Sequence, residues 1–465
     1  MTAADPGTFK AYDIRGIYGR DLDEGGAELI GRAFAHVIGQ MQSKPTTELR
    51  LGLGRDMRLS APAMAAAYAA GMAAAGAHVL DAGMVGTEML YHLVGSRDLD
   101  GGLMCTASHN PKAYTGAKLV RRGAVALSGD AGIGEVRDLV ASYLEPARPL
   151  PAGPAQSAGA VEQVSIEDEF HDAVIKFIDP RAIRPLKVVV DGGNGMAGPM
   201  VGPLLQRLGL QLSECYWQPN GEFPDHEPNP LLPENREFIM SEVVRQQADL
   251  GIAWDGDADR CFFIDDTGQF VDGDFLTALL AESLLRKHPR ATILYDVRAS
   301  RAVADTVEDA GGRPLVNRVG HAFFKARMRE ERDAIFGGEV SGHYYFRDFH
   351  CADSGTIPAL LILEKLSRSG ERMSELLARF RERYFISGEI NSEVSDASGK
   401  IAELAARYPD ARQSRLDGIS IDYDDWHFNV RASNTEPLLR LCLESLRSQA
   451  DMEARRDEVL DVIRG

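Results

Sequence analysis

Three carboxylates alternate within six residues, in the string DGDADR that ends at Arg260. A looped backbone can turn Asp255, Asp257 and Asp259 toward one hard cation, and Mg²⁺ takes oxygen ligands of this kind. Without a cation, three packed carboxylates would repel one another. A calcium EF-hand loop needs Gly and Glu where this chain has Arg260 and Asp266. The pattern therefore favours a Mg²⁺ site, with a solvated acidic turn as the alternative.

A serine that could act as a nucleophile stands in the string CTASHNPKAYTGAK. Pro111 lacks a backbone N–H and restricts the residue before it, so a strand cannot continue through this point. We expect Ser108 to be exposed on a rigid turn, with His109 beside it and Lys118 downstream. That arrangement suits a nucleophile that needs a nearby proton acceptor and a cation. The alternative is an Asx-type turn that only closes a strand.

A third polar string, GEVSGHYY, begins at Gly338. Glu339, Ser341 and His343 alternate in it between small residues, and glycines let a backbone approach a ligand closely. A carboxylate, a hydroxyl and an imidazole in a row can bracket the neighbouring hydroxyls of a sugar. An ordinary Gly-rich turn would explain the same letters, so this motif alone does not decide between the two.

The string RASNTEP combines several donors for an anion. Arg431 offers a planar fork that matches the geometry of a phosphate group. Hydroxyl, amide and backbone donors follow at Ser433, Asn434 and Thr435. The pattern predicts a phosphate-binding loop, and a helix N-cap with a surface arginine is the alternative.

Two further strings place polar side chains beside glycines. FKAYDIRG, close to the N-terminus, holds Lys10, Tyr12 and Arg15, and a salt-bridged edge strand would account for it. VGHAFFK places His321 directly after a glycine. By itself each string is explained by structure alone, so their meaning depends on the other motifs.

The polar strings follow strands in a pattern that repeats three times. Each copy opens with an apolar strand, a turn rich in Asp or Gly, and a helix; the copies start at Leu49, Leu186 and Thr292. The third strand of each copy ends in TASHNP, DGDADR or GEVSGH. Strands that alternate with helices predict βαβ units, whose ligands bind beyond the carboxyl ends of the strands. We therefore expect three similar mixed-sheet α/β domains whose polar turns form one shared site.

The C-terminal part does not repeat this pattern. The strand-like strings ISIDYDDWHFNVRAS and LLRLCLES precede a charged helix from Asp451, which predicts a smaller α+β domain. The string PARPLPAGPAQSAG from Pro146 is typical of a linker. The expected domains are residues 1–148, 149–264, 265–375 and 376–465.

Composition and charge restrict the partners. The chain has 465 residues, 44% apolar and 26% charged, as is usual for globular proteins. Its net charge of −18 repels nucleic acid and anionic lipid, so we expect neither as a partner. Five cysteines without a CxxC pair, and a start without a signal-peptide pattern, predict a cytoplasmic protein. The Ala-rich run from Ala61 is expected to be a buried helix, N-capped by Ser60, rather than a membrane span.

Taken together and in this order, TASHNP, DGDADR, GEVSGH and RASNTEP resemble the motifs of the α-D-phosphohexomutase family, in its bacterial phosphomannomutase/phosphoglucomutase branch. The resemblance covers nearly the whole chain. It implies four domains around a central cleft, three of one α/β topology and a fourth similar to the α+β fold of TATA-binding protein. This agrees with the threefold repeat.

The resemblance also implies roles for individual residues. The expected phosphoserine is Ser108. The implied Mg²⁺ ligands are Ser108, Asp255, Asp257 and Asp259. The implied substrate-binding residues are Lys10, Tyr12, Glu339, Ser341, His343, Arg431, Ser433, Asn434 and Thr435. The implied electrostatic and proton-transfer residues are Arg15, His109, Lys118, Arg260, His321 and His343.

The implied activity is that of an isomerase that interconverts hexose 1-phosphate and hexose 6-phosphate, with mannose and/or glucose as the sugar. Phosphorylated Ser108 would give its phosphoryl group to the sugar phosphate, and a hexose 1,6-bisphosphate would turn and return the other phosphate. The enzyme is expected as a monomer or weak homo-oligomer with small sugar phosphates as partners. Val340 stands where a Gln would indicate a phosphoglucosamine mutase. That enzyme, a metal-dependent hydrolase and a non-catalytic sugar-phosphate-binding protein are the alternatives.

Overall fold

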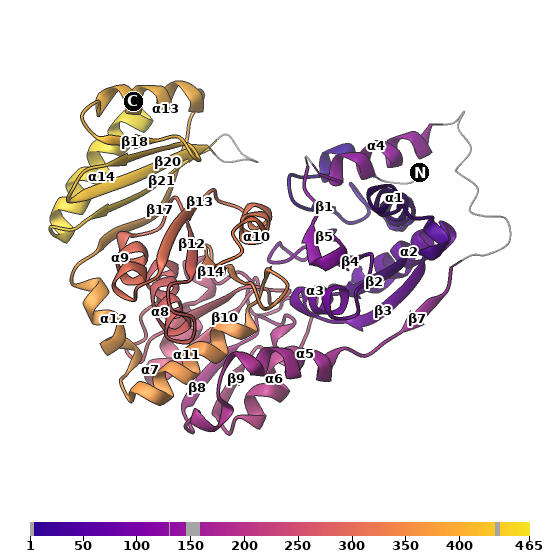
Figure 1. The fold of residues 1–465 in the computed structure, drawn as a ribbon, viewed down its shortest axis with the longest axis horizontal. Helices are drawn as coiled ribbons and strands as arrows, with labels where there is room; N and C mark the ends of the chain where they lie inside the picture. Colours follow the sequence, from indigo (N-terminus) through magenta and orange to yellow (C-terminus); the bar gives the residue numbers. More distant parts are fainter. Residues whose placement is uncertain (1–3, 130, 146–158, 433–437) are drawn as a thin grey trace. The chain divides into compact units, whose positions relative to one another are not determined.

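The structure, a computed structural model, describes residues 4–129, 131–145, 159–432 and 438–465. The chain forms two compact units (Figure 1). Unit 1 comprises residues 1–270 and 345–369, and unit 2 comprises residues 271–344 and 370–465.

The first sheet of unit 1 mixes parallel and antiparallel strands. Its path is β1 (Ile14–Ile17), β5 (Tyr114–Arg121), β4 (Gly101–Cys105), β2 (Arg50–Arg55), β3 (His78–Met84) and β7 (Val161–Gln163), with β6 (Val125–Ala126) on β5. Pairings from β4 to β7 are parallel, whereas β5 runs antiparallel to β4 and β1. Its helices are α1 (Glu24–Gln42), α2 (Ala61–Ala74), α3 (Thr87–Ser96) and α4 (Ile133–Leu144). Residues of α1, α2 and α4 share one apolar core with the strands.

Two glycines allow α1 and α2 to pack closely. A Cβ added at Gly31 in α1 would lie 2.2 Å from the Tyr68 carbonyl oxygen in α2. In return, a Cβ at Gly71 in α2 would lie 1.9 Å from the Glu28 carbonyl oxygen. Both positions therefore require glycine, because the two backbones touch there.

The second sheet of unit 1 is smaller. Its order is β11 (Cys261–Ile264), β10 (Leu250–Trp254), β8 (Lys187–Asp191) and β9 (Gln211–Cys215). β8 pairs in parallel with β9 and β10, and β11 closes the edge in antiparallel pairing with β10. The nearby helices are α5 (Glu167–Val174), α6 (Ala197–Arg207) and α7 (Glu237–Gln246).

A later part of the chain completes unit 1. β15 (Tyr344–Phe346) and β16 (Ala352–Asp353) form an antiparallel pair, and α11 (Thr356–Ser369) follows. The start of α11 is fixed by Glu88, which is fully buried in α3. Its carboxylate accepts hydrogen bonds from the Ser354 hydroxyl and from the Thr356 hydroxyl and N–H, the last two at 2.6 and 3.2 Å. Burial raises the pKa of Glu88 to about 8, although these donors act in the opposite direction.

Unit 2 has a parallel set of strands and an antiparallel sheet (Figure 1). The parallel set is β13 (Arg313–Asn317), β12 (Thr292–Asp296) and β14 (Ala334–Gly338), with helices α8 (Gly273–Lys287), α9 (Arg301–Asp309), α10 (His321–Glu330) and α12 (Met373–Arg381). The antiparallel sheet has the order β17 (Phe385–Glu393), β21 (Leu438–Ser445), β20 (Trp426–Ala432), β19 (Ile419–Asp422) and β18 (Arg412–Ser414). Helices α13 (Ala397–Arg407) and α14 (Gln449–Arg464) pack on it around a separate apolar core.

The threefold repeat is confirmed, as is the smaller C-terminal α+β domain. In each copy the third strand, β4, β10 or β14, is buried along its whole length and parallel to the first strand. Each of these strands ends where a polar string begins, so the fold delivers TASHNP, DGDADR and GEVSGH at strand ends. These three motifs thus lie on loops that follow buried strands.

The Ala-rich run forms α2 with Ser60 at its N-cap position, as expected, but the Ser60 side chain does not cap the helix. Ser60 already has helical angles, φ −75° and ψ −21°, and its side chain makes no capping hydrogen bond within the described residues. A capping side chain normally needs an extended backbone to reach back over the first turn. None of the helices in the described part of the chain is long and apolar enough to span a bilayer.

Glu88 should make stability depend on pH. Because the folded pKa of Glu88, about 8, exceeds its ordinary value of 4.5, its contribution is complete below 4.5 and is lost as pH rises toward 8. The slope is at most about 1.4 kcal/mol per pH unit. Urea unfolding of wild type and Glu88→Gln across this range should show the wild type losing stability relative to the variant. A difference that stays constant with pH would contradict a neutral Glu88.

Candidate active site

The Ser108 turn is held from inside the fold. The Thr106 hydroxyl accepts a hydrogen bond from the Ser108 N–H at 2.8 Å, and Ser108 has a left-handed backbone with φ 49°. The Ser108 hydroxyl donates to Asp255 Oδ2 at 3.0 Å and lies 3.4 Å from His109 Nδ1. The expectation of an exposed serine is wrong, because only 4% of Ser108 is exposed. Gly256 packs against it: a Cβ there would lie 2.6 Å from the Ser108 carbonyl oxygen.

The three aspartates after β10 converge as predicted. Asp255, Asp257 and Asp259 are buried, and one carboxylate oxygen of each lies within 4.8 Å of the others. Asp257 Oδ1 and Asp259 Oδ1 are buried but find no hydrogen-bond partner among the described residues. Buried carboxylate oxygens without donors are costly unless a cation meets them. This donor set fits a hard divalent metal ion, whose preferred ligands are oxygens.

Two cations lie among these carboxylates. Lys118 Nζ, on β5, contacts Asp257 Oδ2 at 2.7 Å and also contacts Asp259 Oδ2. Arg260 contacts Asp255 Oδ2 through both Nε and Nη2, at 3.0 and 2.7 Å. Two positive charges against three negative ones leave one negative charge in excess, which again favours a further cation.

Burial and neighbouring charge shift the titration of this group. Burial raises the pKa of Asp255 to about 6, against the opposing effect of Arg260. Burial would also raise the pKa of Asp257, but Lys118 and the hydroxyl donors beside it together outweigh burial and hold that pKa well below its usual range. Burial, with a smaller effect of the Arg260 guanidinium, holds the pKa of His109 well below its ordinary value, so its imidazole is neutral. Its Nδ1 faces both Arg260 Nη2 and the Ser108 hydroxyl.

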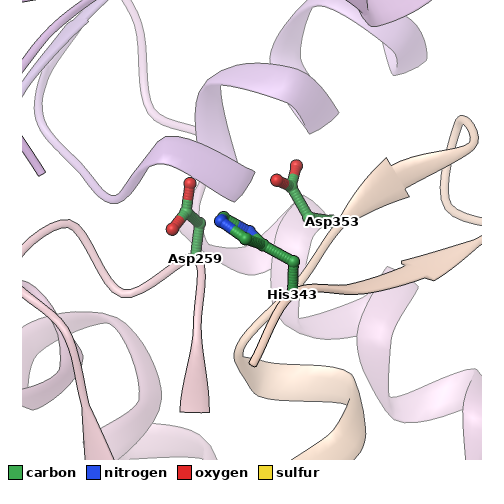
Figure 2. A group of neighbouring side chains, drawn as sticks. All are labelled: Asp259, His343 and Asp353. Carbon is green, nitrogen blue, oxygen red and sulfur yellow. The ribbon is translucent and has the colours of Figure 1, made fainter. Parts of the chain in front are cut away.

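Several residues of this group were missed from the sequence. Thr87, at the start of α3, donates its hydroxyl to Asp257 Oδ2, and its N–H bonds to the Asp257 carbonyl oxygen at 3.1 Å. The Thr106 hydroxyl lies 3.3 Å from the same Asp257 Oδ2. Asp353 on β16 is buried, with an oxygen within 4.8 Å of one of Asp259; Figure 2 shows both carboxylates. Nothing in the strings around Thr87 and Asp353 distinguishes them from structural residues.

The N-terminal string reaches the Ser108 turn through one residue. Arg15 on β1 contacts the Asn110 side-chain oxygen through Nη1 and Asp13 through Nη2. Lys10 is exposed and Tyr12 is half-buried in the segment before β1. The structure therefore brings Arg15 to the turn and leaves the part that Lys10 and Tyr12 play as a prediction.

In unit 2, the GEVSGHYY string is anchored by its carboxylate. Glu339 is buried, and its Oε2 accepts the Gly320 N–H at 3.1 Å, next to His321 at the start of α10. The rings of His321 and His343 stack with centroids 6.1 Å apart. Ser341 is half-buried within the same turn. Three of the predicted residues, Glu339, His321 and His343, are thus gathered at one end of this sheet.

A buried ion pair also holds the GEVSGHYY string in place. Asp296 at the end of β12 accepts the Val340 N–H at 3.0 Å and contacts Arg298 Nη2 at 2.8 Å. Arg298 Nη1 then reaches Glu389 on β17 at 2.8 Å. Arg298 was also missed, since its string VRASR carries no pattern beyond a strand end.

Arg431 is buried rather than a surface arginine, so that alternative is excluded. Its side chain is 6% exposed and its Nε lies 3.3 Å from Asp417 Oδ1. Asp417 Oδ2 also accepts the Val319 N–H at 3.0 Å, which ties Arg431 to the segment before His321. Ser433, Asn434 and Thr435 lie outside the described residues.

Thr87 should control metal affinity through Asp257. Removing its hydroxyl in Thr87→Val leaves Asp257 without one of its donors, and loss of such a supporting bond typically weakens metal binding about 10-fold or more. Calorimetric titration of the metal-free protein with Mg²⁺ would measure this. Thr46→Val, which removes a hydroxyl bonded to the Ala75 carbonyl oxygen, is the matched control and should bind as wild type. Equal affinity of Thr87→Val and Thr46→Val would contradict the assignment.

Models of one protein family match the chain in four consecutive parts. The phosphoglucomutase/phosphomannomutase alpha/beta/alpha domains I, II and III match residues 6–145, 168–268 and 272–384, and the C-terminal domain matches residues 389–462. These parts include the Ser108 turn, the acidic loop, the GEVSGHYY string and RASNTEP. All four motifs therefore lie in matched domains of one family.

Whole proteins match as well. The phosphohexose mutases of Xanthomonas campestris pv. campestris are 42% identical over 98% of this chain and 99% of theirs. A phosphomannomutase of Salmonella montevideo is 43% identical over 98% of both chains. A crystal structure of a phosphoglucomutase/phosphomannomutase family protein from Burkholderia thailandensis superposes with a TM-score of 0.88 at 33% identity, over 99% of this chain and 97% of the other. The chain thus belongs to the phosphoglucomutase/phosphomannomutase family of α-D-phosphohexomutases and is an isomerase that interconverts hexose 1-phosphate and hexose 6-phosphate.

Proposed function

We propose that this phosphohexomutase carries the transferring phosphoryl group on Ser108 and works through a hexose 1,6-bisphosphate. The observation that carries the proposal is the contact of the Ser108 hydroxyl with Asp255 Oδ2, at 3.0 Å, inside the buried acidic group. A serine beside a cation-binding carboxylate cluster suits phosphoryl transfer, in which catalysis is chiefly positioning and charge stabilisation.

The metal in this proposal is Mg²⁺, held by Asp255, Asp257, Asp259 and the Ser108 side chain. When bound, Mg²⁺ supplies positive charge that stabilises the oxygens of the transferring phosphoryl group. The buried Oδ1 atoms of Asp257 and Asp259, which find no hydrogen-bond partner among the described residues, support this assignment. Calcium is disfavoured by the missing EF-hand positions, and zinc by the lack of Cys or His in the loop.

In this proposal, four further side chains of unit 1 assist the transfer of the phosphoryl group. Lys118 and Arg260 hold the carboxylates in place and offset their charge. His109 is neutral and 3.4 Å from the Ser108 hydroxyl, so we assign it a part in moving the hydroxyl proton. Arg15, fixed on Asn110 and Asp13, adds a cation at the rim of the turn.

Most of the residues that we assign to recognition of the sugar phosphate belong to unit 2, and two belong to unit 1. Glu339, Ser341 and His343 offer a carboxylate, a hydroxyl and an imidazole to the sugar hydroxyls. His321 joins His343 in the electrostatic group, and their stacked rings support a shared task. We assign the non-reacting phosphate to the loop that contains Arg431, Ser433, Asn434 and Thr435, and further substrate contacts to Lys10 and Tyr12. Asp417 supports this assignment by orienting the Arg431 guanidinium.

The sugar in this proposal is mannose and glucose. The relatives are named phosphohexose mutases and phosphomannomutase, and Val340 stands where a phosphoglucosamine mutase would have Gln. The enzyme would work in the cytoplasm as a monomer or weak homo-oligomer. Its partners are small sugar phosphates. The five cysteines, all within the described ranges, are free thiols, which fits a reducing compartment.

Phosphate mapping tests the role of Ser108. Incubation with glucose 1,6-bisphosphate should add one phosphate to the protein, and mass spectrometry should find it on the peptide that contains Ser108. Ser108→Ala should take up none and should lose turnover, whereas Ser128→Ala, a serine of the same domain outside the turn, should behave as wild type. Phosphate on another serine of the wild type would overturn the proposal.

Substrate competition tests the sugar. Glu339 and Ser341 can bind the O3 and O4 hydroxyls that mannose and glucose share, since these epimers differ at C2. Coupled assays with mannose 1-phosphate, glucose 1-phosphate and glucosamine 1-phosphate should therefore give comparable kcat/KM for the first two, within about tenfold. A clear preference for glucosamine 1-phosphate would replace this assignment with a phosphoglucosamine mutase.

A further inference from the structure

Arg58 lies directly beneath the Ser108 turn. It follows β2, and its side chain is only 1% exposed. The guanidinium Nη1 and Nη2 donate to four backbone carbonyl oxygens, those of Ser108 (2.7 Å), Asn110 (2.6 Å), Pro111 (2.9 Å) and Tyr114 (3.2 Å). Its remaining nitrogen, Nε, faces Asp56 Oδ2 at 3.2 Å. One side chain thus meets four carbonyls of a single turn.

The convergence of these carbonyls needs such a partner. Carbonyl oxygens cannot bond to one another, and a buried acceptor left without a donor is destabilising. The Pro111 carbonyl has one further donor, the Tyr114 N–H at 3.0 Å. The backbone is also constrained, because Ser108 has φ 49° in the left-handed region, which is unusual for a residue with a Cβ. Only a planar guanidinium supplies enough fixed donors for this fork.

Arg58 is itself held on three sides. Its own N–H bonds to Asp56 Oδ1 at 3.0 Å, and the Asp56 N–H bonds to the Cys105 carbonyl oxygen at 3.0 Å, so the ends of β2 and β4 are joined. Asp56 is fully buried and supplies the opposite charge. The ring of Phe223 lies 5.3 Å from the guanidinium carbon, within the range of a cation–π contact. The guanidinium therefore has a fixed position from which to set the turn.

We propose that Arg58 is a positioning residue for the transfer of the phosphoryl group: by holding the Ser108 carbonyl, it aims the Ser108 hydroxyl at Asp255. The inference rests on the proposed role of Ser108. Arg58 acts through the backbone, since its bonds go to the carbonyls of the turn while the hydroxyl points to the acidic loop. Gly256 of the acidic loop packs against the same carbonyl, so a rotation of this peptide group would change that contact.

Arg58→Lys separates positioning from charge. Lysine keeps the positive charge but offers a single ammonium in place of a planar fork, so it cannot hold four carbonyls in the same geometry. We expect kcat to fall about 10²-fold, the cost of a misplacement of about 1 Å, while KM changes less than about threefold. The rate at which glucose 1,6-bisphosphate labels Ser108 should fall in parallel, and Mg²⁺ affinity should stay as in wild type.

Chemical rescue of Arg58→Ala tests the same point without a new side chain. Guanidinium chloride at low millimolar concentration should raise kcat of this variant at least about tenfold, and equal sodium chloride or methylammonium chloride should not. Arg184→Ala is the matched control, because Arg184 also bonds a backbone carbonyl in unit 1, that of Leu366, at 2.8 Å; its activity should be unchanged and insensitive to guanidinium.

The outcomes separate the two proposals. If wild type is labelled on Ser108 but a folded Arg58→Lys is labelled at the same rate, the positioning role is wrong and the phosphoserine stands. A folded Arg58→Ala that guanidinium does not rescue would also overturn positioning. Should Arg58→Ala not fold, the Arg58→Lys rates decide alone. Labelling of wild type on another residue would reject the proposed function itself.

Discussion

Charge balance in the loop after β10 is the constraint on which the rest of the site depends. Three carboxylates are removed from water there, and each must find positive charge or a donor. Lys118 comes from β5 and Arg260 from the loop itself, while Thr87 and Thr106 add hydroxyls from two other segments. The mixed sheet brings two of these segments together, because the Ser108 turn follows β4 and Lys118 lies on the neighbouring strand β5.

The architecture could be predicted from the sequence because, in this fold, the polar motifs directly follow the ends of buried strands. Buried strands such as β4, β10 and β14 are apolar runs, and the polar letters begin where burial ends. The aspartate cluster was predictable too, since its three carboxylates alternate within one short string of the chain. The division into residues 1–148, 149–264, 265–375 and 376–465 stays a prediction, although the family models follow a similar order.

What the sequence could not show are contacts between distant segments. Arg58 precedes the turn it supports by 50 residues, and Thr87 lies 170 residues from Asp257. Neither residue belongs to a recognisable sequence motif, because a single arginine or threonine produces no periodic pattern. The exposure of Ser108 was misjudged on the same ground: a Pro-containing turn normally faces water, but here Arg58 satisfies its carbonyls and Gly256 covers it.

The place of Lys118 among the aspartates has a consequence for how the protein matures. Its ammonium already contacts Asp257 and Asp259, so the acidic loop has a counter-ion before a metal ion arrives. Folding therefore does not have to wait for metal, unlike in domains whose ligands stay unfolded without it. A metal ion bound at the proposed site would be repelled by the tethered ammonium beside the same carboxylates, which lowers the net gain from binding. An ion bound at the proposed site would then exchange with the free ions around the protein, and its occupancy would follow their concentration.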